Sequence, residues 1–445
     1  MTGVFLGEKP SFWRKKVSPP SPLFQESRFY AEDLSGFETC MVFESAFCFC
    51  SAYFAGGGIP SAMSLLKGYA GMRAKKTLAG LVFAALLLYN GVAWAKNGET
   101  SARAACVIER QTGRILFAAN ETERLPMAST TKVMTALVAL ENGELDEPVT
   151  AGKNAYGVPG TSIYLGLGES LTLEQMLYGL MLSSGNDAAV AIAEHFGGSV
   201  EGFCEMMNAR AAELGAADTH FVTPHGLPCE GHYTTALDLA RIAAEAMGDD
   251  TFRQIVSTQR ASIPWEGHEY MRVLKNKNAL LRTYSGATGI KTGFTRAAGR
   301  CLVFGAEREG MELVGAVLNC GDWFNEAARL MDAVFAAYSW TELLPDGADM
   351  GEIAVFGGEN ESARLVLKGA LAAPLALDEA ATMRLELDEI AAAPQPAGAQ
   401  AGWAYMELDG ETLCARPIVF AEPVRREPAA LQRFIRQWTI IKGEP

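Results

Sequence analysis

Hydrophobic residues follow a strand-like spacing at both ends of the region from about residue 103 to 340, and a helical spacing between. Near the start, two strand-like runs flank Gln111-Thr112-Gly113, which is typical of a hairpin turn. Strand-like runs return around Gly289–Lys291, and a helix is predicted from Trp323 to Tyr338. This order predicts an α+β fold, in which the first and last segments of an antiparallel sheet pair and helices cover the sheet.

The helical part of this region contains several elements. One pattern begins in PMASTTKVMTAL, residues 126–137, and continues through VMTALVALEN. A pair of helical patterns broken at Ser183–Asn186 follows, and further helices are predicted over Val200–Leu214 and in ALDLARIAAEAM. The segment TPHGLPCEGHYT is predicted to be a loop rich in proline and glycine.

The pattern changes near Leu343-Leu344-Pro345. Alternating runs such as EIAVF, ARLVLK, MRLELDEI, WAYMEL and PIVFAE predict a small all-β domain over residues 350–422. Within it, AAAPQPAGAQAG is predicted to be a flexible loop.

The last segment, residues 423–445, predicts an amphipathic helix that begins near Pro428. Basic residues fall mainly on other faces of this helix and beside its ends. Such a helix suits a membrane interface, being too short and too charged to span a bilayer. A helix docked on the β domain would show the same pattern. The apolar stripe consists of Leu431, Phe434, Ile435, Trp438 and Ile441.

Residues 72–95 have the pattern of a secretory signal peptide. A basic run at Met72–Lys76 precedes an apolar run over Leu78–Val92, and Ala93-Trp94-Ala95 supplies a small-x-small cleavage pattern. The apolar run is shorter than the ~20 residues that cross a bilayer, which favours cleavage. We interpret residues 1–71 as an upstream extension from a mis-assigned start. A genuine cytoplasmic extension would instead make the apolar run a signal anchor.

The composition suits a folded protein of two or three domains. The chain has 445 residues, 49% hydrophobic and 20% charged, so it can bury large cores. Its net charge of −14 argues against a general nucleic-acid binder, which would present a basic surface. Three of the nine cysteines precede the predicted cleavage site, and no CxxC pair or zinc-ligand spacing occurs. Most of the other six lie in apolar runs, which leaves room for one disulfide but argues against a disulfide framework.

Ser129 and Lys132 lie three residues apart where a helical pattern begins, so they share one face of the predicted helix. Two interpretations are open. In the first, Ser129 caps the helix and Lys132 is solvated. In the second, Lys132 takes the proton from the Ser129 hydroxyl, which is a poor nucleophile without an adjacent base. An S-x-x-K match alone carries little information in a chain of this length.

Two more short motifs follow in order. Ser184-Gly185-Asn186 lies at the predicted helix break, where side chains can project into a cleft. Lys291-Thr292-Gly293 lies in a strand-like run, where Gly293 lets a ligand or another backbone approach closely. Each also fits an ordinary structural role, as a turn tripeptide or a solvated strand end. The ordered set of three is therefore more informative than any one motif.

This ordered set resembles the penicilloyl-serine transferases, whose signature elements are S-x-x-K, S-x-N and K-T-G. The longer stretches PMASTTKVMTA, LMLSSGNDAA, TPHGLP…HYTTALDLA and GIKTGFTRAAGRCLV most resemble the D-alanyl-D-alanine carboxypeptidase branch of the low-molecular-mass penicillin-binding proteins. The resemblance covers residues 103 to 340 and continues more weakly to the C-terminal helix. It implies a β-lactamase/transpeptidase-like sheet covered by helices, within a catalytic domain at residues 96–345.

The resemblance also implies a function. The protein would be a serine-type carboxypeptidase that removes the terminal D-alanine from peptidoglycan stem pentapeptides, which limits cross-linking. The reaction would pass through an acyl-enzyme, and β-lactam antibiotics would acylate the same serine. No cofactor is implied. Carboxypeptidases of this branch commonly carry a C-terminal amphipathic anchor, so we expect an exported protein on the outer face of the cytoplasmic membrane.

Roles for the motif residues follow from the same resemblance. The base must be neutral part of the time, which requires desolvation or a neighbouring cation such as Lys291. The implied oxyanion hole consists of backbone N–H groups and so needs no particular side chain. The implied roles are: Ser129, nucleophile; Lys132, base; Ser184, proton relay to the leaving D-alanine; Asn186, contact with the peptide side; Lys291 and Thr292, contact with the terminal carboxylate; Ser129 and Phe294 N–H groups, oxyanion hole.

Other functions fit the sequence less well. His220, His225, Cys229 and His232 crowd one loop, but their spacing fits no zinc pattern, and no metal is expected. A β-lactamase of related fold would be expected to carry an E-x-x-L-N motif between Asn186 and Lys291, and no such motif occurs there. A non-catalytic wall-binding protein would be expected to lose a motif residue.

The family often holds the substrate carboxylate with an arginine after the KTG strand, and CGDWFNEAARL offers no assignable one.

Overall fold

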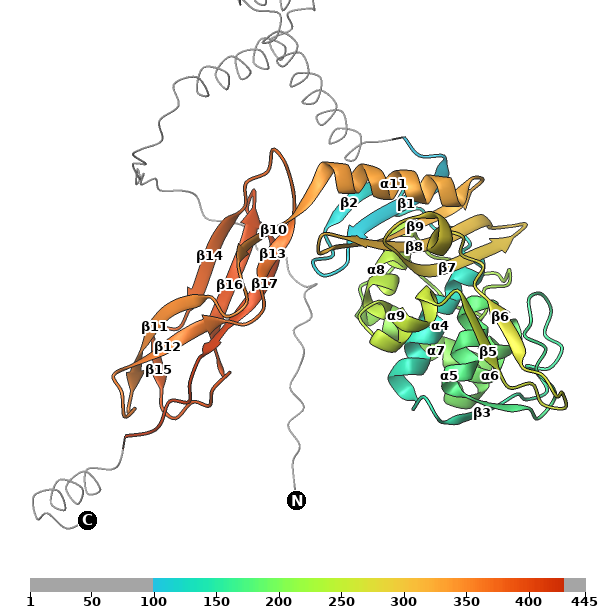
Figure 1. Ribbon diagram of the computed structural model, residues 1–445, viewed down its shortest axis with the longest axis horizontal. Helices are drawn as coiled ribbons and strands as arrows, with labels where there is room; N and C mark the ends of the chain where they lie inside the picture. Colours follow the sequence, from blue (N-terminus) through green and yellow to red (C-terminus); the bar gives the residue numbers. More distant parts are fainter. Residues whose placement is uncertain (1–98, 428–445) are drawn as a thin grey trace, which may run out of the picture. The chain divides into compact units, whose positions relative to one another are not determined.

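The computed structural model describes residues 99–427, which form an α+β region followed by a region built of strands (Figure 1). The predicted signal peptide and C-terminal amphipathic helix lie outside the described residues. None of the helices within residues 99–427 is long and apolar enough to cross a bilayer.

A five-stranded antiparallel sheet forms the centre of the α+β region, in the order β2-β1-β9-β8-β7 (Figure 1). The first strand pairs with a late one, since Ala102 lies opposite Cys320, which confirms the predicted closure of the sheet. The predicted hairpin at Gln111–Gly113 is also confirmed, because it joins the paired strands β1 and β2. The strands are β1 (Ala102–Glu109), β2 (Ile115–Ala119), β7 (Ala287–Thr295), β8 (Gly299–Arg308) and β9 (Met311–Cys320).

Helices cover both faces of this sheet. On one face, α8 packs on β1 and β9 while α9 packs on β7; on the other, α11 packs on β8 and β9. α4, α5, α6 and α7 form a layer beyond α8 and α9 (Figure 1), whereas α10 and the turn η2 contact β7. The helical elements are a 3₁₀ turn η2 (Ala128–Thr131), α4 (Lys132–Asn142), α5 (Leu173–Leu182), α6 (Asn186–Gly197), α7 (Val200–Glu213), α8 (Ala236–Ala246), α9 (Asp250–Ser257), α10 (Leu280–Thr283) and α11 (Trp323–Ala337).

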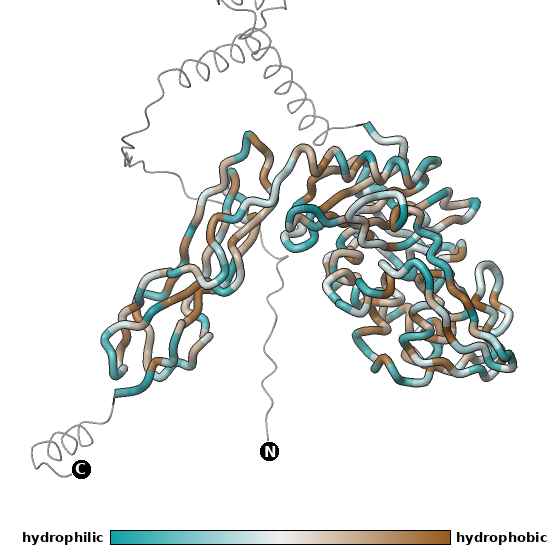
Figure 2. The backbone as a smooth tube through the Cα atoms, in the orientation of Figure 1, coloured by the Kyte–Doolittle hydropathy of each residue, from teal (hydrophilic) through white to brown (hydrophobic). Residues whose placement is uncertain are grey.

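Burial on both faces explains why β1 is a nearly continuous hydrophobic run. Cys106 and Ile108 belong to the core shared with the helical layer, whereas Ala105 and Val107 belong to the core beneath α11. Successive side chains of a strand point to opposite faces, so a covered sheet needs apolar residues at every position. Figure 2 shows these hydrophobic stretches along the central strands and the packed helices.

Two small hairpin-like pairs were not predicted from the sequence. β3 (Pro148–Thr150) pairs with β4 (Ser170–Thr172), and β5 (Arg260–Ile263) pairs with β6 (Arg272–Lys275). Strands of three or four residues are too short to show a periodic pattern, so no hydrophobic pattern marks them in the sequence.

The strand-built region follows α11 directly. The helix predicted to end at Tyr338 ends at Ala337, because Tyr338 already begins β10, which pairs with β13. The other strands form a sheet in the order β14-β16-β17-β12-β11-β15. The predicted loop AAAPQPAGAQAG is shorter than expected, since its ends lie in β15 and β16. The strands are β10 (Tyr338–Leu344), β11 (Asp349–Phe356), β12 (Ser362–Leu367), β13 (Leu371–Ala376), β14 (Thr382–Leu387), β15 (Ile390–Ala392), β16 (Gln400–Leu408) and β17 (Glu411–Phe420).

Candidate active site

Ser129 lies in the 3₁₀ turn η2, immediately before α4, and Lys132 is the first residue of that helix. The interpretation of Ser129 as a helix cap is wrong, because the N-cap of α4 is Thr131 and no side chain caps the helix. Ala128 has φ 51°, a left-handed conformation that non-glycine residues rarely adopt. A strained residue beside a reactive group needs surrounding structure that holds it in place.

The loop after α7 provides that support. Thr131 donates its hydroxyl to the Ala128 carbonyl and contacts His232 Nε2 at 2.8 Å. Because the Val222 N–H donates to His232 Nδ1, the proton of this imidazole lies on Nε2 and is donated to Thr131. Burial lowers the pKa of His232 to about 4, which keeps the ring neutral. A glycine at 226 is required as well, since a Cβ there would lie 1.9 Å from the Ala128 oxygen.

Lys132 is fully buried, and its Nζ contacts three oxygens. They are Ser129 Oγ at 3.1 Å, Asn186 Oδ1 at 2.8 Å and the His225 carbonyl at 2.8 Å. Burial lowers the pKa of Lys132 well below its usual value, and the nearby charges of Lys291 and Lys277 lower it further. The Asp187 carboxylate opposes these effects more weakly.

The three oxygens around Lys132 Nζ define the orientation of its amine when the amine is neutral. The oxygens of Asn186 and His225 can only accept hydrogen bonds, so they take the two N–H groups of an uncharged amine. The lone pair then faces the Ser129 hydroxyl, which can donate to it. The arrangement is therefore chemically suited to moving the Ser129 proton onto Lys132.

The predicted break between two helices is confirmed at the SGN motif. α5 ends at Leu182, and α6 begins at Asn186. Ser184 has φ 64° and is almost fully buried. The Asn186 amide donates Nδ2–H to the Pro159 carbonyl at 2.7 Å, which turns its Oδ1 toward Lys132.

The KTG motif lies on β7, beside the serine turn. Lys291 is buried and donates to the Thr292 carbonyl at 3.0 Å. Burial, together with the charge of Lys277, lowers the pKa of Lys291 to about 7. Gly293 lies close to the turn that contains Ser129, because a Cβ on residue 293 would lie 2.9 Å from the Ser129 nitrogen. Thr292 is largely buried, whereas the Phe294 side chain is 62% exposed.

Sequence reasoning missed Lys277, which lies between β6 and α10. Its charge lowers the pKa values of both Lys132 and Lys291, and desolvation lowers its own pKa. An additional positive charge at the site thus comes from before β7, whereas the family resemblance implies an arginine after it. Lys277 belongs to no sequence motif, so its proximity to Lys132 and Lys291 becomes apparent only in the folded structure.

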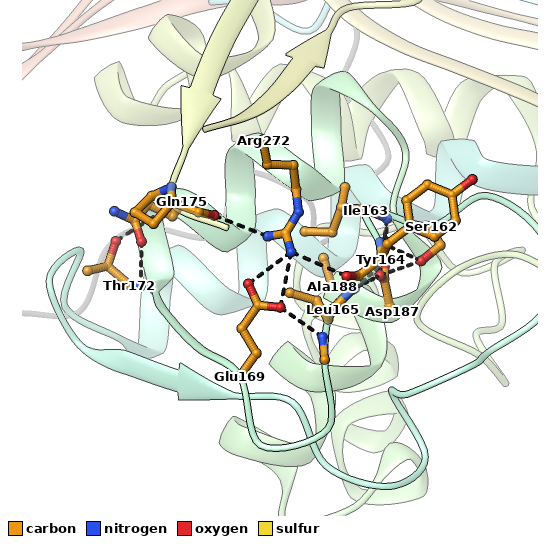
Figure 3. Close-up of polar contacts among 12 residues, drawn as sticks. Ser162, Ile163, Tyr164, Leu165, Glu169, Thr172, Gln175, Asp187, Ala188 and Arg272 are labelled. Atoms are coloured by element: carbon orange, nitrogen blue, oxygen red, sulfur yellow. Dashed lines mark hydrogen bonds and ion pairs between the residues drawn. The ribbon is translucent and has the colours of Figure 1, made fainter. Parts of the chain in front are cut away.

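Asp187, directly after the SGN motif, anchors the loop that borders Asn186 (Figure 3). Its buried carboxylate accepts hydrogen bonds from the Ser162 hydroxyl and from the N–H groups of Ile163 and Leu165, both at 3.0 Å. The Asn186 N–H donates to the Thr161 carbonyl at 2.7 Å in the same loop. Three backbone donors and one side chain therefore hold this loop against the start of α6.

The histidines of the loop that suggested a metal site form hydrogen bonds within the protein. His220 Nδ1 contacts the Gly231 carbonyl, and His225 Nδ1 accepts from the Leu227 N–H. Within residues 99–427, no group of three or more His, Cys, Asp or Glu residues is placed to hold a metal ion. The six cysteines in these residues have free thiols, and only Cys229 among them is exposed.

Comparisons with known proteins agree with this arrangement. The family model of D-alanyl-D-alanine carboxypeptidases matches residues 92–321, a range that includes every site residue described above. The D-alanyl-D-alanine carboxypeptidase DacF of Bacillus subtilis (strain 168) is 30% identical over 354 residues, covering 77% of this chain and 91% of DacF. Penicillin binding protein 5 from Haemophilus influenzae aligns with a TM-score of 0.61 at 28% identity, covering 74% of this chain and 98% of that one. The Streptomyces K15 DD-transpeptidase aligns with a TM-score of 0.51 at 36% identity, covering 54% and 98%.

Replacing Gly293 with alanine should displace the serine turn. The new Cβ would lie 2.9–3.1 Å from backbone atoms of Ser129, Thr130 and Met127, and a backbone cannot move aside as a flexible side chain can. We expect hydrolysis of a diacetylated tripeptide ending in D-Ala-D-Ala to fall about 100-fold, because small misplacements of reacting groups cost that much. Gly321→Ala is the matched control, since a Cβ there meets no atom within 4 Å. Equal activity in the two variants would contradict the close approach.

Proposed function

This chain belongs to the D-alanyl-D-alanine carboxypeptidase family, and on that premise we propose that Ser129 is the residue through which it removes the terminal D-alanine from peptidoglycan stem peptides. The observation that supports this assignment is the contact between Ser129 Oγ and the buried Lys132 Nζ at 3.1 Å. A buried lysine with a depressed pKa beside a serine hydroxyl is the base that such a nucleophile requires.

In the proposed acylation step, Lys132 takes the Ser129 proton while Oγ bonds to the carbonyl carbon of the penultimate D-alanine. The N–H groups of Ser129 and Phe294 stabilise the negative charge on the carbonyl oxygen. The C–N bond then breaks, and the proton held by Lys132 passes through Ser184 to the leaving amine of D-alanine, which makes Lys132 neutral again. Water attacks the resulting ester, with Lys132 again as the base, and restores Ser129.

Substrate binding is proposed to use the positive charges near β7. Lys291 and Thr292 contact the terminal carboxylate, and Asn186 contacts the peptide on the other side of the scissile bond. Lys277 adds positive charge, which compensates for the lack of an assignable arginine after the KTG strand. Gly293 permits the close packing that sets these groups beside Ser129.

We also propose the organisation of the chain and its location. Residues 72–95 act as the signal peptide, 96–345 as the catalytic domain, 350–422 as the β domain and 423–445 as a membrane-associating helix, with residues 1–71 an upstream extension. The mature enzyme then lies on the outer face of the cytoplasmic membrane, facing the wall. The stripe of Leu431, Phe434, Ile435, Trp438 and Ile441 supports this placement.

Penicillin should acylate Ser129 alone. Mass spectrometry of the intact protein should show one penicilloyl adduct, and Ser129→Ala should remove it and reduce peptide hydrolysis on the order of 10⁴-fold or more. An adduct that survives in Ser129→Ala would refute the assignment of the nucleophile.

The two lysines of the motifs should respond differently to substitution. Lys132→Ala should abolish acylation, because a general base contributes about 10²- to 10⁴-fold in rate. Lys291→Arg keeps the charge but changes the donor geometry, so it should lose only about tenfold, the cost of one weakened charged hydrogen bond. Complete loss of acylation in both variants would contradict this division of roles.

The pH profile of kcat/KM provides a second readout for Lys291. Its charge is present below pH 7 and is lost as pH rises through about 7, so kcat/KM should fall on the alkaline side. Arginine stays protonated throughout this range. In Lys291→Arg the alkaline fall should therefore move to higher pH, whereas an unchanged profile would exclude Lys291 as its cause.

Deleting residues 428–445 should release the enzyme from membranes. This cut keeps the bridges from Val424 to Gln395 and from Arg426 to Gly358, so the strand-built region stays intact. The truncated protein should appear in the soluble fraction and still bind penicillin. A full-length Phe434→Ser/Trp438→Ser variant should behave in the same way, because it removes apolar surface without shortening the chain. If these variants unfold, or remain with membranes, the anchor proposal is wrong.

A further inference from the structure

A pocket of about 440 Å³ opens between residues 168–171 and the tip of the β5–β6 hairpin, residues 264–271. It is distinct from the candidate active site, because none of its lining residues belongs to the three motifs. The hairpin carries no part of the proposed chemistry. Its composition nevertheless concentrates aromatic and acidic side chains on an exposed tip.

Three aromatic rings pack against one another on this tip, with angles of 44–85° between their planes. The centroids of Trp265 and His268 lie 4.4 Å apart, those of His268 and Tyr270 5.1 Å, and those of Trp265 and Tyr270 5.7 Å. The rings contact one another, so only their outer faces are open to a ligand. Tyr270 is 62% exposed, although exposed aromatic side chains ordinarily add little to folding.

A buried arginine holds this surface in place. The Arg272 guanidinium lies 5.0 Å from the centroid of the Trp265 ring and donates to both oxygens of Glu169, at 2.9 and 3.0 Å (Figure 3). It also donates to the carbonyls of Pro264 and Tyr164. Arg272 therefore fixes the position of the aromatic tip. It also links the tip to the loop that Asp187 anchors beside Asn186, because Tyr164 belongs to that loop.

The charge of the pocket restricts the ligand. Its lining includes the exposed residues Glu266 and Glu269 and no lysine or arginine, whereas the charge of Glu169 is already paired with Arg272. Carboxylates accept hydrogen bonds and repel anions, so they favour a ligand that is rich in O–H and N–H donors and carries no negative charge. The ligand also needs an apolar face, because the exposed Tyr270 ring offers a face on which one such group can stack.

We propose that this pocket binds the glycan strand of peptidoglycan, with the apolar face of an N-acetylated sugar on the aromatic rings and its hydroxyl or amide groups on the carboxylates. The inference rests on the proposed function, because the stem peptide that is cleaved is covalently attached to this glycan. A pyranose ring combines an apolar C–H face with several donors, which matches both features of the pocket. The glycan would thereby hold the stem peptide near Ser129.

The first experiment compares two substrates in the full chain. A His268→Ala/Tyr270→Ala variant removes two rings and leaves Trp265 on Arg272. Its apparent KM for stem peptides on glycan strands should rise about tenfold, whereas kcat/KM for the free tripeptide should not change. Phe356→Ala, which removes a 77% exposed aromatic ring from the strand-built region, should alter neither value. Equal effects on both substrates, or no effect on the polymer, would overturn the proposal.

The second experiment measures binding without catalysis, which separates this proposal from the assignment of Ser129. An oligomer of β-1,4-linked N-acetylglucosamine should give saturation-transfer NMR signals with the Ser129→Ala protein. These signals should disappear when His268→Ala/Tyr270→Ala is added. Binding that persists in the combined variant, or is absent from the Ser129→Ala protein, would refute the glycan pocket. Binding of an anionic polyphosphate at the same rings would refute it as well, since the carboxylates should exclude such a ligand.

Discussion

The burial of the Lys132 amine is the constraint on which the rest of the site depends. An amine without access to water must find hydrogen-bond acceptors in the protein, and each acceptor here comes from a different element. Ser129 lies in the turn before α4, Asn186 begins α6, and the His225 carbonyl belongs to the loop after α7. The same burial favours the neutral amine, so packing and reactivity have one physical cause.

This constraint extends outward through supports that have no chemical role of their own. Asn186 can present Oδ1 to Lys132 because Pro159 accepts from its Nδ2, and Asp187 holds the loop that contains Thr161 and its neighbours. On the opposite side, His232 and Thr131 fix the strained Ala128, and Gly293 lets β7 approach the turn. Many packed residues therefore position the few atoms that are proposed to react, as a rigid scaffold does in an accurate site.

Charge is distributed unevenly around this scaffold. The chain as a whole carries −14, yet Lys132, Lys291 and Lys277 lie close enough to influence one another. Like charges in a buried site lower one another's pKa, which favours the neutral amine that the proposed role of Lys132 as a base requires. The pocket at the β5–β6 hairpin has the opposite character, with carboxylates and aromatic rings. One surface thus suits an anionic peptide end, and the other suits an uncharged sugar.

The sequence by itself determined the α+β order of elements, the hairpin at Gln111–Gly113, the helix break at Ser183–Asn186 and the three motifs, because these depend on local periodicity and on residues close in the chain. It could not place Ser129 in a 3₁₀ turn rather than as a helix cap. Nor could it identify Lys277, whose influence on Lys132 and Lys291 depends on segments that meet only after folding. The brace between Arg272 and Glu169, 103 residues apart, is likewise a product of the tertiary structure. Burial and long-range proximity set pKa values and hydrogen-bond partners, and neither is written in local sequence patterns.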